Sequence, residues 1–254
     1  METGAITQYV DVAQIVLYMF WIFFAGLIYY LLRENHREGY PMDSGRPNGP
    51  VTGGWPPVPA SKTYRLENGR TVISPNPNRP DGEYSFESAN PWSGSPIEPK
   101  GDPLLAGVGP GAWANRVDEP DLDSEGHPSF VPLRVATEYS VSPKDVDPRG
   151  LPVIGADGET AGTVCDLWID RSEVIFRFIE FSLNGSGEHV MIPINYARIT
   201  ATGVKINALM SNQFGNVPRI RSTDQITLLE EEKIAAYYGA GTLYAHPNRQ
   251  EPLL

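Results

Sequence analysis

The sequence predicts a single transmembrane α-helix followed by a mainly β cytoplasmic domain that ends in a helix. Three observations lead to this fold class. Residues 12–32 form an uncharged apolar run that is long enough to cross a bilayer. From about residue 150, apolar runs of strand length alternate with turn residues, which is typical of a small antiparallel β-barrel. A helix-capping pattern then begins at Thr227.

The transmembrane segment is the run VAQIVLYMFWIFFAGLIYYLL, from Val12 to Leu32. At 1.5 Å of rise per residue, roughly 20 apolar residues cross a bilayer core of about 30 Å. A signal peptide and a buried core helix are the alternatives. No basic region precedes the run and no small-residue cleavage site follows it, which favours a membrane span.

The charges on either side of this span predict its orientation. Glu2 and Asp11 precede it, whereas Arg33 and Arg37 follow it directly. Because positively charged residues stay on the cytoplasmic side, residues 1–11 are expected outside and the remaining chain inside.

Residues 33–149 are expected to be largely extended. Of the 24 prolines, 19 lie between Tyr40 and Pro148, and each removes a backbone donor and resists helix formation. Aromatic residues such as Trp55 and Tyr64 recur in this part of the chain, and rings of this size need a surface to bury against. The segment is therefore expected to drape over partner proteins, with short strands such as one around Thr71 to Ile73.

Residues 150–254 are expected to form the barrel and the carboxyl-terminal helix. The runs GTVCDLWID, VIFRFIEFSL, EHVMIPI and VKINAL are separated by the turns RSE, NGSG and TATG. In the second run, strict alternation places Val174, Phe176 and Phe178 on one face and Ile175, Ile179 and Phe181 on the other, so both faces need cover. The sequence from Thr227 to Glu230 matches a capping box, and Gly239 is expected to end the helix.

Composition excludes several classes of function. The net charge is −11, with 20 basic against 31 acidic residues, which argues against nucleic acid as a partner. The only cysteine, Cys165, excludes an intrachain disulfide and a cysteine-built metal site, and the four histidines lack ligand spacing, so no metal site is expected. No P-loop, dinucleotide-binding loop or serine-nucleophile elbow is present in the sequence.

Two groups of ionisable residues could carry chemistry. Asp166 and Asp170 are expected on one face of a strand, Glu173 in the following turn, and Arg177 on the face that carries Ile175 and Ile179. A guanidinium on an apolar face needs a counter-charge, so Arg177 is expected to pair with Asp170 or Glu173. A purely structural ion pair is the alternative.

The second group lies in the loop PDLDSEGHP, which contains Asp121, Asp123, Glu125 and His127. It places carboxylates within reach of an imidazole, a side chain that ordinarily titrates near neutral pH. An ordinary solvated loop is the alternative.

Several blocks in order resemble the H-chain family of the photosynthetic reaction centre of purple bacteria, over essentially the whole chain. They are RENHREGYP from Arg33, GDPLLAGVGPGAW from Gly101, VPLRVATEYSV from Val131, DVDPRGLPV from Asp145, AGTVCDLWIDRSE from Ala161, and NVPRIRSTDQITLLEEEKIAAYYGAGTLYA from Asn216. The resemblance implies that the barrel is of the PRC type.

The resemblance also implies partners and cofactors. Members of this family cap the cytoplasmic face of the L and M subunits in the bacterial inner, or chromatophore, membrane, with a periplasmic amino terminus. They bind no pigment themselves and are not enzymes. The complex carries bacteriochlorophyll, bacteriopheophytin, quinones and a non-haem iron, with carotenoid, a cytochrome subunit and light-harvesting antenna as further candidates. The implied functions are to stabilise L and M and to conduct protons to the secondary quinone.

Residue by residue, the resemblance makes Glu173 the acid nearest the quinone pocket, Asp170 its relay neighbour, and Arg177 the charge that tunes them. Asp123 and His127 would lie at the proton-uptake surface. Glu125 stands where the family often has a second histidine, which puts strong inhibition by transition metals in doubt while leaving proton exchange intact.

Arg33, Arg37 and Tyr40 resemble the family's contacts to anionic lipids and to L and M, although both arginines also serve as plain topology determinants. Two other functions fit parts of the sequence. A membrane-tethered PRC-barrel adaptor outside photosynthesis is the first. An anchored hydrolase using His127 with nearby acids is the second, and it lacks a nucleophile.

Overall fold

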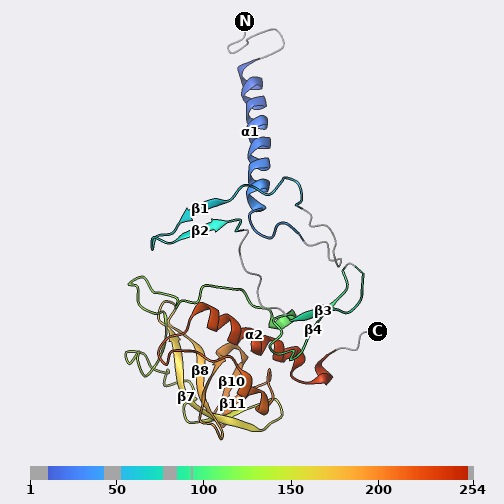
Figure 1. The fold of residues 1–254 in the computed structure, drawn as a ribbon. Coiled ribbons are helices and arrows are strands. Elements are labelled where there is room, and N and C mark those ends of the chain that lie inside the picture. The colour runs from blue at the N-terminus through green and yellow to red at the C-terminus, as the bar shows by residue number, and fades with distance from the viewer. Residues whose placement is uncertain (1–10, 43–52, 77–84, 93, 251–254) are drawn as a thin grey trace. The chain divides into compact units, whose positions relative to one another are not determined.

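The computed structural model describes residues 11–42, 53–76, 85–92 and 94–250, and it divides the chain into two compact units. The first unit comprises Met1–Asp81 with Ala89–Pro96, and the second comprises Gly82–Ser88 with Ile97–Leu254. Figure 1 shows the helix of the first unit and the sheets of the second. The segment predicted as residues 1–11 lies outside the described residues except for Asp11.

Helix α1 of the first unit spans Val12–Asn35 and contains no buried residue. Its mean hydropathy over an 18-residue window is 2.2, so it is long and apolar enough to cross a membrane. The side chain of Asp11 caps the helix by accepting a hydrogen bond from the backbone N–H of Gln14, at 2.7 Å. The helix ends three residues later than the predicted Leu32, because Arg33, Glu34 and Asn35 continue it.

A hairpin completes the described core of the first unit. Strands β1 (Lys62–Arg65) and β2 (Thr71–Ser74) pair antiparallel, with Thr63 opposite Ile73 and Tyr64 opposite Val72. The strand predicted around Thr71 to Ile73 is confirmed.

The second unit is mainly β. Strands β3 (Phe86–Ser88) and β4 (Ile97–Pro99) form a small antiparallel pair. The main sheet has the order β10-β11-β6-β7-β8-β9, and β5 pairs with β7. Its strands are β5 (Phe130–Pro132), β6 (Pro152–Ile154), β7 (Thr160–Asp170), β8 (Ile175–Leu183), β9 (His189–Pro193), β10 (Ala197–Thr200) and β11 (Gly203–Ile206).

The four predicted strand runs correspond to β7, β8, β9 and β11, while β5, β6 and β10 were not predicted. All pairs in the main sheet are antiparallel except β6 with β11, which are parallel. Short 3₁₀ helices occur at Gly109–Gly111, Ile194–Tyr196, Ser211–Asn216 and Pro247–Arg249.

The predicted face assignment of β8 is wrong because the strand contains a β-bulge. Phe178 pairs with Trp168 and Phe176 pairs with Ile169, so Arg177 is an extra residue with no cross-strand partner. The bulge inverts the alternation, so Phe176 shares a face with Ile179 rather than with Phe178. Both faces are nevertheless covered, since Phe178, Ile179 and Phe181 are all buried.

Helix α2 spans Leu228–Tyr244 and starts at the predicted capping box. The Thr227 hydroxyl accepts the Glu230 N–H at 3.2 Å, and the Glu230 carboxylate accepts the Thr227 N–H at 3.0 Å. The prediction that Gly239 ends the helix is wrong. A Cβ at this position would lie 2.3 Å from the carbonyl oxygen of Pro110, so Gly239 is there for close packing.

The core of the second unit lies between the main sheet and α2. Its largest fully buried side chains include Trp168 from β7, Phe181 from β8, and Tyr237 and Tyr238 from α2. The Tyr238 hydroxyl donates to the carbonyl oxygen of Met191 in β9, which fixes the helix against the sheet.

Candidate functional site

The first part of the candidate site is the tight turn between β7 and β8. The side chain of Asp170, at the end of β7, is 6% exposed and accepts the backbone N–H groups of Ser172 at 2.9 Å and Glu173 at 3.2 Å. The N–H of Val174 closes the turn on the Asp170 carbonyl oxygen at 2.8 Å. These bonds hold Asp170 at the base of the turn, and Glu173, three residues later, has a side chain that is 58% exposed.

Arg177 joins the two acids of this turn. Its Nη2 lies 2.6 Å from Oε2 of Glu173, and its Nε lies 3.5 Å from Oδ2 of Asp170. The predicted pairing is confirmed, and both named acids take part. The bulge at Arg177 is the local reason, because it turns this side chain toward the end of β7.

The short strand β5 brings the predicted loop to this turn. Phe130 pairs with Asp170, and the N–H of Arg171 donates to the carbonyl oxygen of Ser129 at 2.9 Å. The hydroxyls of Ser129 and Ser172 are 3.3 Å apart. The two candidate groups, which are more than 40 residues apart in sequence, are therefore neighbours in the fold.

Within the loop, Asp123 organises the other candidates. Its Oδ1 accepts the backbone N–H groups of Glu125 and His127, both at 2.9 Å. These bonds, led by the one from His127, lower the pKa of Asp123. Nδ1 of His127 lies 3.7 Å from a carboxylate oxygen of both Asp123 and Glu125, and the imidazole is 61% exposed. The side chains of His127 and Glu125 are exposed to water, whereas the Asp123 side chain is 19% exposed.

The other end of the loop is fastened to the start of α2. The N–H of Leu228 donates to the carbonyl oxygen of Glu119 at 3.0 Å, and the Thr227 hydroxyl donates to Asp118 at 2.8 Å. Arg221 pairs with both Asp118 and Glu230. The loop therefore connects the amino-terminal end of α2 with the end of β7.

Glu231 is a candidate that the sequence reasoning missed. Burial raises its pKa, and the positive charges of Arg116 and Arg177 only partly oppose this. The negative charges of Glu232 and Asp121 raise it further. The charge of Glu231 thus interacts with the charges of Arg177 in the turn and Asp121 in the loop. The signal available in the sequence was the triplet EEE in the first turns of the predicted helix.

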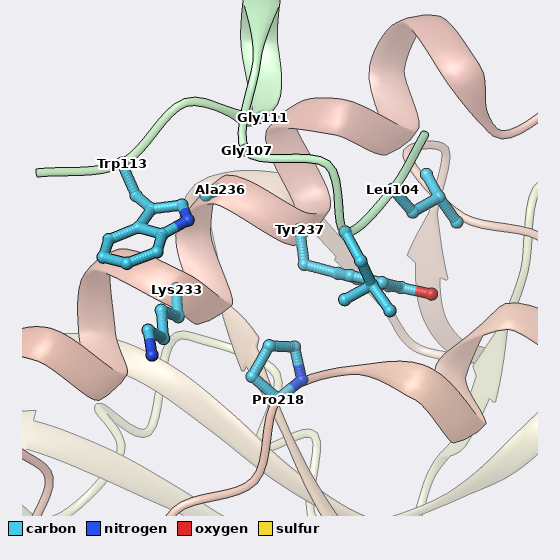
Figure 2. A pocket seen from close by; sticks show the side chains of 9 residues that line it. Leu104, Gly107, Gly111, Trp113, Pro218, Lys233, Ala236 and Tyr237 are labelled. Carbon is cyan, nitrogen blue, oxygen red and sulfur yellow. The ribbon is translucent and has the colours of Figure 1, made fainter. Parts of the chain in front are cut away.

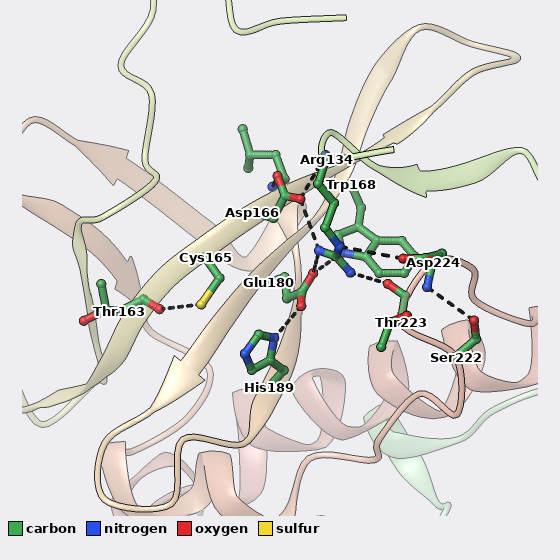
Figure 3. Close-up of polar contacts among 11 residues, drawn as sticks. Arg134, Thr163, Cys165, Asp166, Trp168, Glu180, His189, Ser222, Thr223 and Asp224 are labelled. Carbon is green, nitrogen blue, oxygen red and sulfur yellow. Dashed lines mark hydrogen bonds and ion pairs between the residues drawn. The ribbon is translucent and has the colours of Figure 1, made fainter. Parts of the chain in front are cut away.

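A separate buried charge cluster lies further along β7 (Figure 3). Arg134 lies 3.1 Å from Asp166 and 2.6 Å from Glu180, and both carboxylates are buried. Glu180 also accepts from Trp168 Nε1 at 2.8 Å and lies 2.5 Å from Nδ1 of His189. The sequence reasoning grouped Asp166 with Asp170, whereas the structure places Asp166 with Arg134.

The pKa of Glu180 reports the balance in this cluster. Burial alone raises the pKa, but the hydrogen bonds from Arg134, His189 and Trp168 outweigh it, so the pKa lies below the ordinary value. The cluster borders an open cleft of about 450 Å³ that also includes Arg149. Its charges are satisfied mutually, which indicates a structural role.

A smaller hollow of about 160 Å³ lies between α2 and residues 104–113 of the second unit (Figure 2). Trp113, Tyr237 and Leu104 provide its apolar walls, and Nζ of Lys233 lies 4.8 Å from the centre of the Trp113 ring. The volume is below the roughly 300 Å³ of ordinary ligand sites. Within the described residues, no group of three or more histidine, cysteine, aspartate or glutamate side chains is arranged to hold a metal ion.

The collar residues Arg33, Arg37 and Tyr40, which follow the apolar run of α1, differ in their contacts. Arg33 is exposed, whereas Arg37 is bound within the chain to Glu34 at 2.7 Å and to the carbonyl oxygens of Ala60 and Ser74. The Tyr40 ring stacks on His36 at 3.8 Å between ring centres. Arg33 is therefore the collar cation with the most freedom to meet a lipid or another protein.

Two family models match the chain. The model described as "Photosynthetic reaction centre, H-chain N-terminal region" matches residues 4–135, and the model of the PRC-barrel domain matches residues 144–211. The first covers more than half of the sequence and the second covers most of the main sheet.

Proposed function

Because this chain belongs to the H-chain family of the photosynthetic reaction centre, we propose that it caps the L and M subunits on their cytoplasmic side and conducts protons to the secondary quinone. The family membership itself makes the chain an accessory, structural subunit of a reaction-centre complex. The capping contacts and the proton path go beyond that membership.

We propose that α1 crosses the bacterial inner membrane with its amino terminus in the periplasm. The uncharged run and the cations that follow it support this orientation. We further propose that the partner subunits hold the bacteriochlorophyll, bacteriopheophytin, quinone and iron of the complex, as membership of this family implies.

The observation that carries the proton role is the pairing of β5 with the end of β7, which joins the loop of Asp123 to the turn at Asp170 through Ser129 and Phe130. The loop exposes His127 and Glu125 to water beside Asp123, and the turn holds two carboxylates next to one guanidinium. A proton relay needs an exposed acceptor surface and buried acids behind it in the same path, and here β5 joins the two.

In this function, Nδ1 of His127 and the carboxylates of Asp123 and Glu125 take up protons from the cytoplasm. Glu231 and Asp170 pass them inward as carboxyl groups, and Glu173 delivers them at the protein surface that faces the quinone pocket. The guanidinium of Arg177 lies 2.6 Å from Glu173 and 3.5 Å from Asp170, so it positions both carboxylates in the path. The quinone supplies the driving chemistry, since it accepts protons when it is reduced.

Purification of the native complex tests the accessory role. A tagged chain isolated from its host membrane should carry the absorption bands of bacteriochlorophyll, and deletion of residues 1–32 should reduce the yield of assembled pigment-protein. A colourless preparation would support a membrane-tethered adaptor instead.

Proton uptake after light flashes tests the relay. Glu231→Gln should slow uptake measured with a pH-indicator dye, because it removes a carboxyl group whose pKa burial raises and whose charge interacts with Arg177 and Asp121. Glu232→Gln is the matched control on the same helix turn, since Glu232 pairs with Arg116 at 3.0 Å. Equal uptake rates in the two variants would remove Glu231 from the path.

A further inference from the structure

The β1–β2 hairpin lies beside the end of α1, at the level where the apolar run gives way to charges (Figure 1). Arg37 donates to the carbonyl oxygens of Ala60 at 2.8 Å and Ser74 at 2.9 Å, one on each side of the hairpin. Lys62 lies 2.9 Å from Glu34, and its Nζ is 5.9 Å from the centre of the Tyr30 ring. These contacts fix the hairpin to the last turns of the helix.

Trp55, which precedes the hairpin in the sequence, contacts an aromatic residue of α1. The ring of Trp55 lies 5.8 Å from that of Tyr29, yet 76% of Trp55 is exposed. Tyr29 and Tyr30 belong to the final part of the uncharged run, where aromatic side chains favour the membrane–water interface. Trp55 therefore adds a third ring to this aromatic belt, although it is distant in sequence.

The hairpin has apolar surface that the described residues of its unit leave exposed. Tyr64, Leu66, Val72 and Ile73 are 42–48% exposed, and all residues of β1 are exposed. A two-stranded hairpin on its own is only marginally stable in water, so it needs a surface to lie on.

The charge of the hairpin is opposite to that of the whole chain. Residues 62–74 contain Lys62, Arg65 and Arg70 against one acid, Glu67, whereas the chain carries a net charge of −11. Basic residues beside exposed apolar and aromatic ones favour the anionic headgroup layer of a bilayer.

We propose that Trp55 and the β1–β2 hairpin form a second membrane contact, which lies in the anionic lipid interface next to α1. This inference rests on the proposed membrane span of α1. The apolar side chains enter the boundary between headgroups and acyl chains, and Arg65 meets lipid phosphates. The contact fixes the depth and rotation of α1 and gives the extended segment a starting point at the membrane surface.

The experiment uses the full chain in its native complex, reconstituted in nanodiscs that contain phosphatidylcholine with or without phosphatidylglycerol. In a Cys165→Ser background, a fluorophore is attached at Ile73→Cys in the hairpin. Matched labels are placed at Ile22→Cys in α1 and at Lys205→Cys in the sheet unit. Two quenchers are compared: a nitroxide near the lipid headgroup and aqueous iodide.

The proposal predicts at least threefold stronger nitroxide quenching at Ile73→Cys than at Lys205→Cys, with weak iodide quenching. Strong iodide quenching at Ile73→Cys would place the hairpin in water, and protection from both quenchers would place it under another protein. Either result overturns the proposal. For the label at Ile22→Cys, a third quencher is used, a nitroxide attached to the lipid acyl chain. Absence of quenching there would overturn the membrane span of α1 as well.

A charge-reversal variant tests the proposed contact with anionic lipid. Phosphatidylglycerol should increase nitroxide quenching at Ile73→Cys, and Arg65→Glu should abolish that increase. Arg198→Glu, an exposed arginine in β10, should leave it unchanged. If phosphatidylglycerol still increases nitroxide quenching in the Arg65→Glu variant, the increase does not depend on the charge of Arg65. That result would overturn the proposed contact with anionic lipid.

Discussion

Replacing Glu180 by glutamine should destabilise the sheet unit, because one carboxylate there serves three donors. Glu180 is bonded to Arg134 at 2.6 Å, to Trp168 at 2.8 Å and to His189 at 2.5 Å, and its side chain is 5% exposed. Glutamine has nearly the same shape, so the substitution removes the charge while it leaves the packing largely intact.

The expected loss follows from these contacts. Hydrogen bonds to a charged group contribute about 1.5–3 kcal/mol each, and breaking a buried ion pair costs about 3–5 kcal/mol. Glutamine keeps one oxygen for a donor, and Arg134 retains Asp166 and partial contact with water. We therefore expect Glu180→Gln to lower the free energy of unfolding by about 2–3 kcal/mol near neutral pH.

The pH dependence gives a second signature. The pKa of Glu180 in the folded chain lies below the reference value of 4.5, so its ionised form stabilises the fold above about that pH. This contribution is lost as the pH falls through the lower folded-state value. The difference between the parent chain and Glu180→Gln should therefore shrink as the pH falls below about 4.5.

Chemical unfolding of the full chain in detergent, followed by near-ultraviolet circular dichroism, measures both effects. Glu188→Gln is the matched control, because Glu188 forms an exposed ion pair with Arg219 at 3.0 Å. That substitution should cost less than about 1 kcal/mol. Equal losses for the two variants, or a difference that does not change with pH, would refute the reasoning.

Three further predictions concern the backbone, each measured by the same unfolding assay. Gly239→Ala should destabilise the chain by about 1–3 kcal/mol, since the new Cβ would press on the Pro110 carbonyl, whereas Gly215→Ala has open space and should be nearly neutral. Thr227→Ala should cost about 1 kcal/mol through loss of the helix cap, and an unchanged unfolding midpoint would contradict that role. Val174→Gly should stabilise by about 1 kcal/mol, because Val174 has φ of 56° in the β7–β8 turn; a destabilised variant would refute the strain.

The features that depend on local composition could be predicted from the sequence. Helix α1 needs only a long apolar run, and α2 needs a capping box with Thr227 and Glu230. The strands β7, β8 and β9 are long enough to be recognised by their β-branched and aromatic residues.

The features that depend on distant partners could not be predicted. Strand β6 has three residues and pairs in parallel with β11, which no local pattern indicates. The bulge at Arg177 depends on the register between β7 and β8, so simple alternation assigned the wrong faces. Gly239 has the composition of a helix end, but its role is set by the contact with Pro110.

The contacts of the candidate site also fall into those that the local sequence indicates and those that depend on tertiary packing. The pairing of Arg177 with Asp170 and Glu173 followed from the cost of an unpaired charge on an apolar strand. Its proximity to the loop of Asp123 depends on β5, a strand of only three residues, and could not be predicted. The burial that raises the pKa of Glu231 is set by tertiary packing, which no local pattern in the sequence indicates.

The most direct test of the central claim is the rate of the second electron transfer to the secondary quinone after light flashes, in native complexes that carry Asp170→Asn together with Glu173→Gln. The matched control carries Asp145→Asn with Glu159→Gln, two exposed acids in other turns. We predict that the relay variant slows this step about tenfold or more, while primary charge separation stays unchanged. A tenfold slower step corresponds to an activation barrier that is higher by about 1.4 kcal/mol. A relay variant as fast as its control would contradict proton delivery through the turn at Asp170.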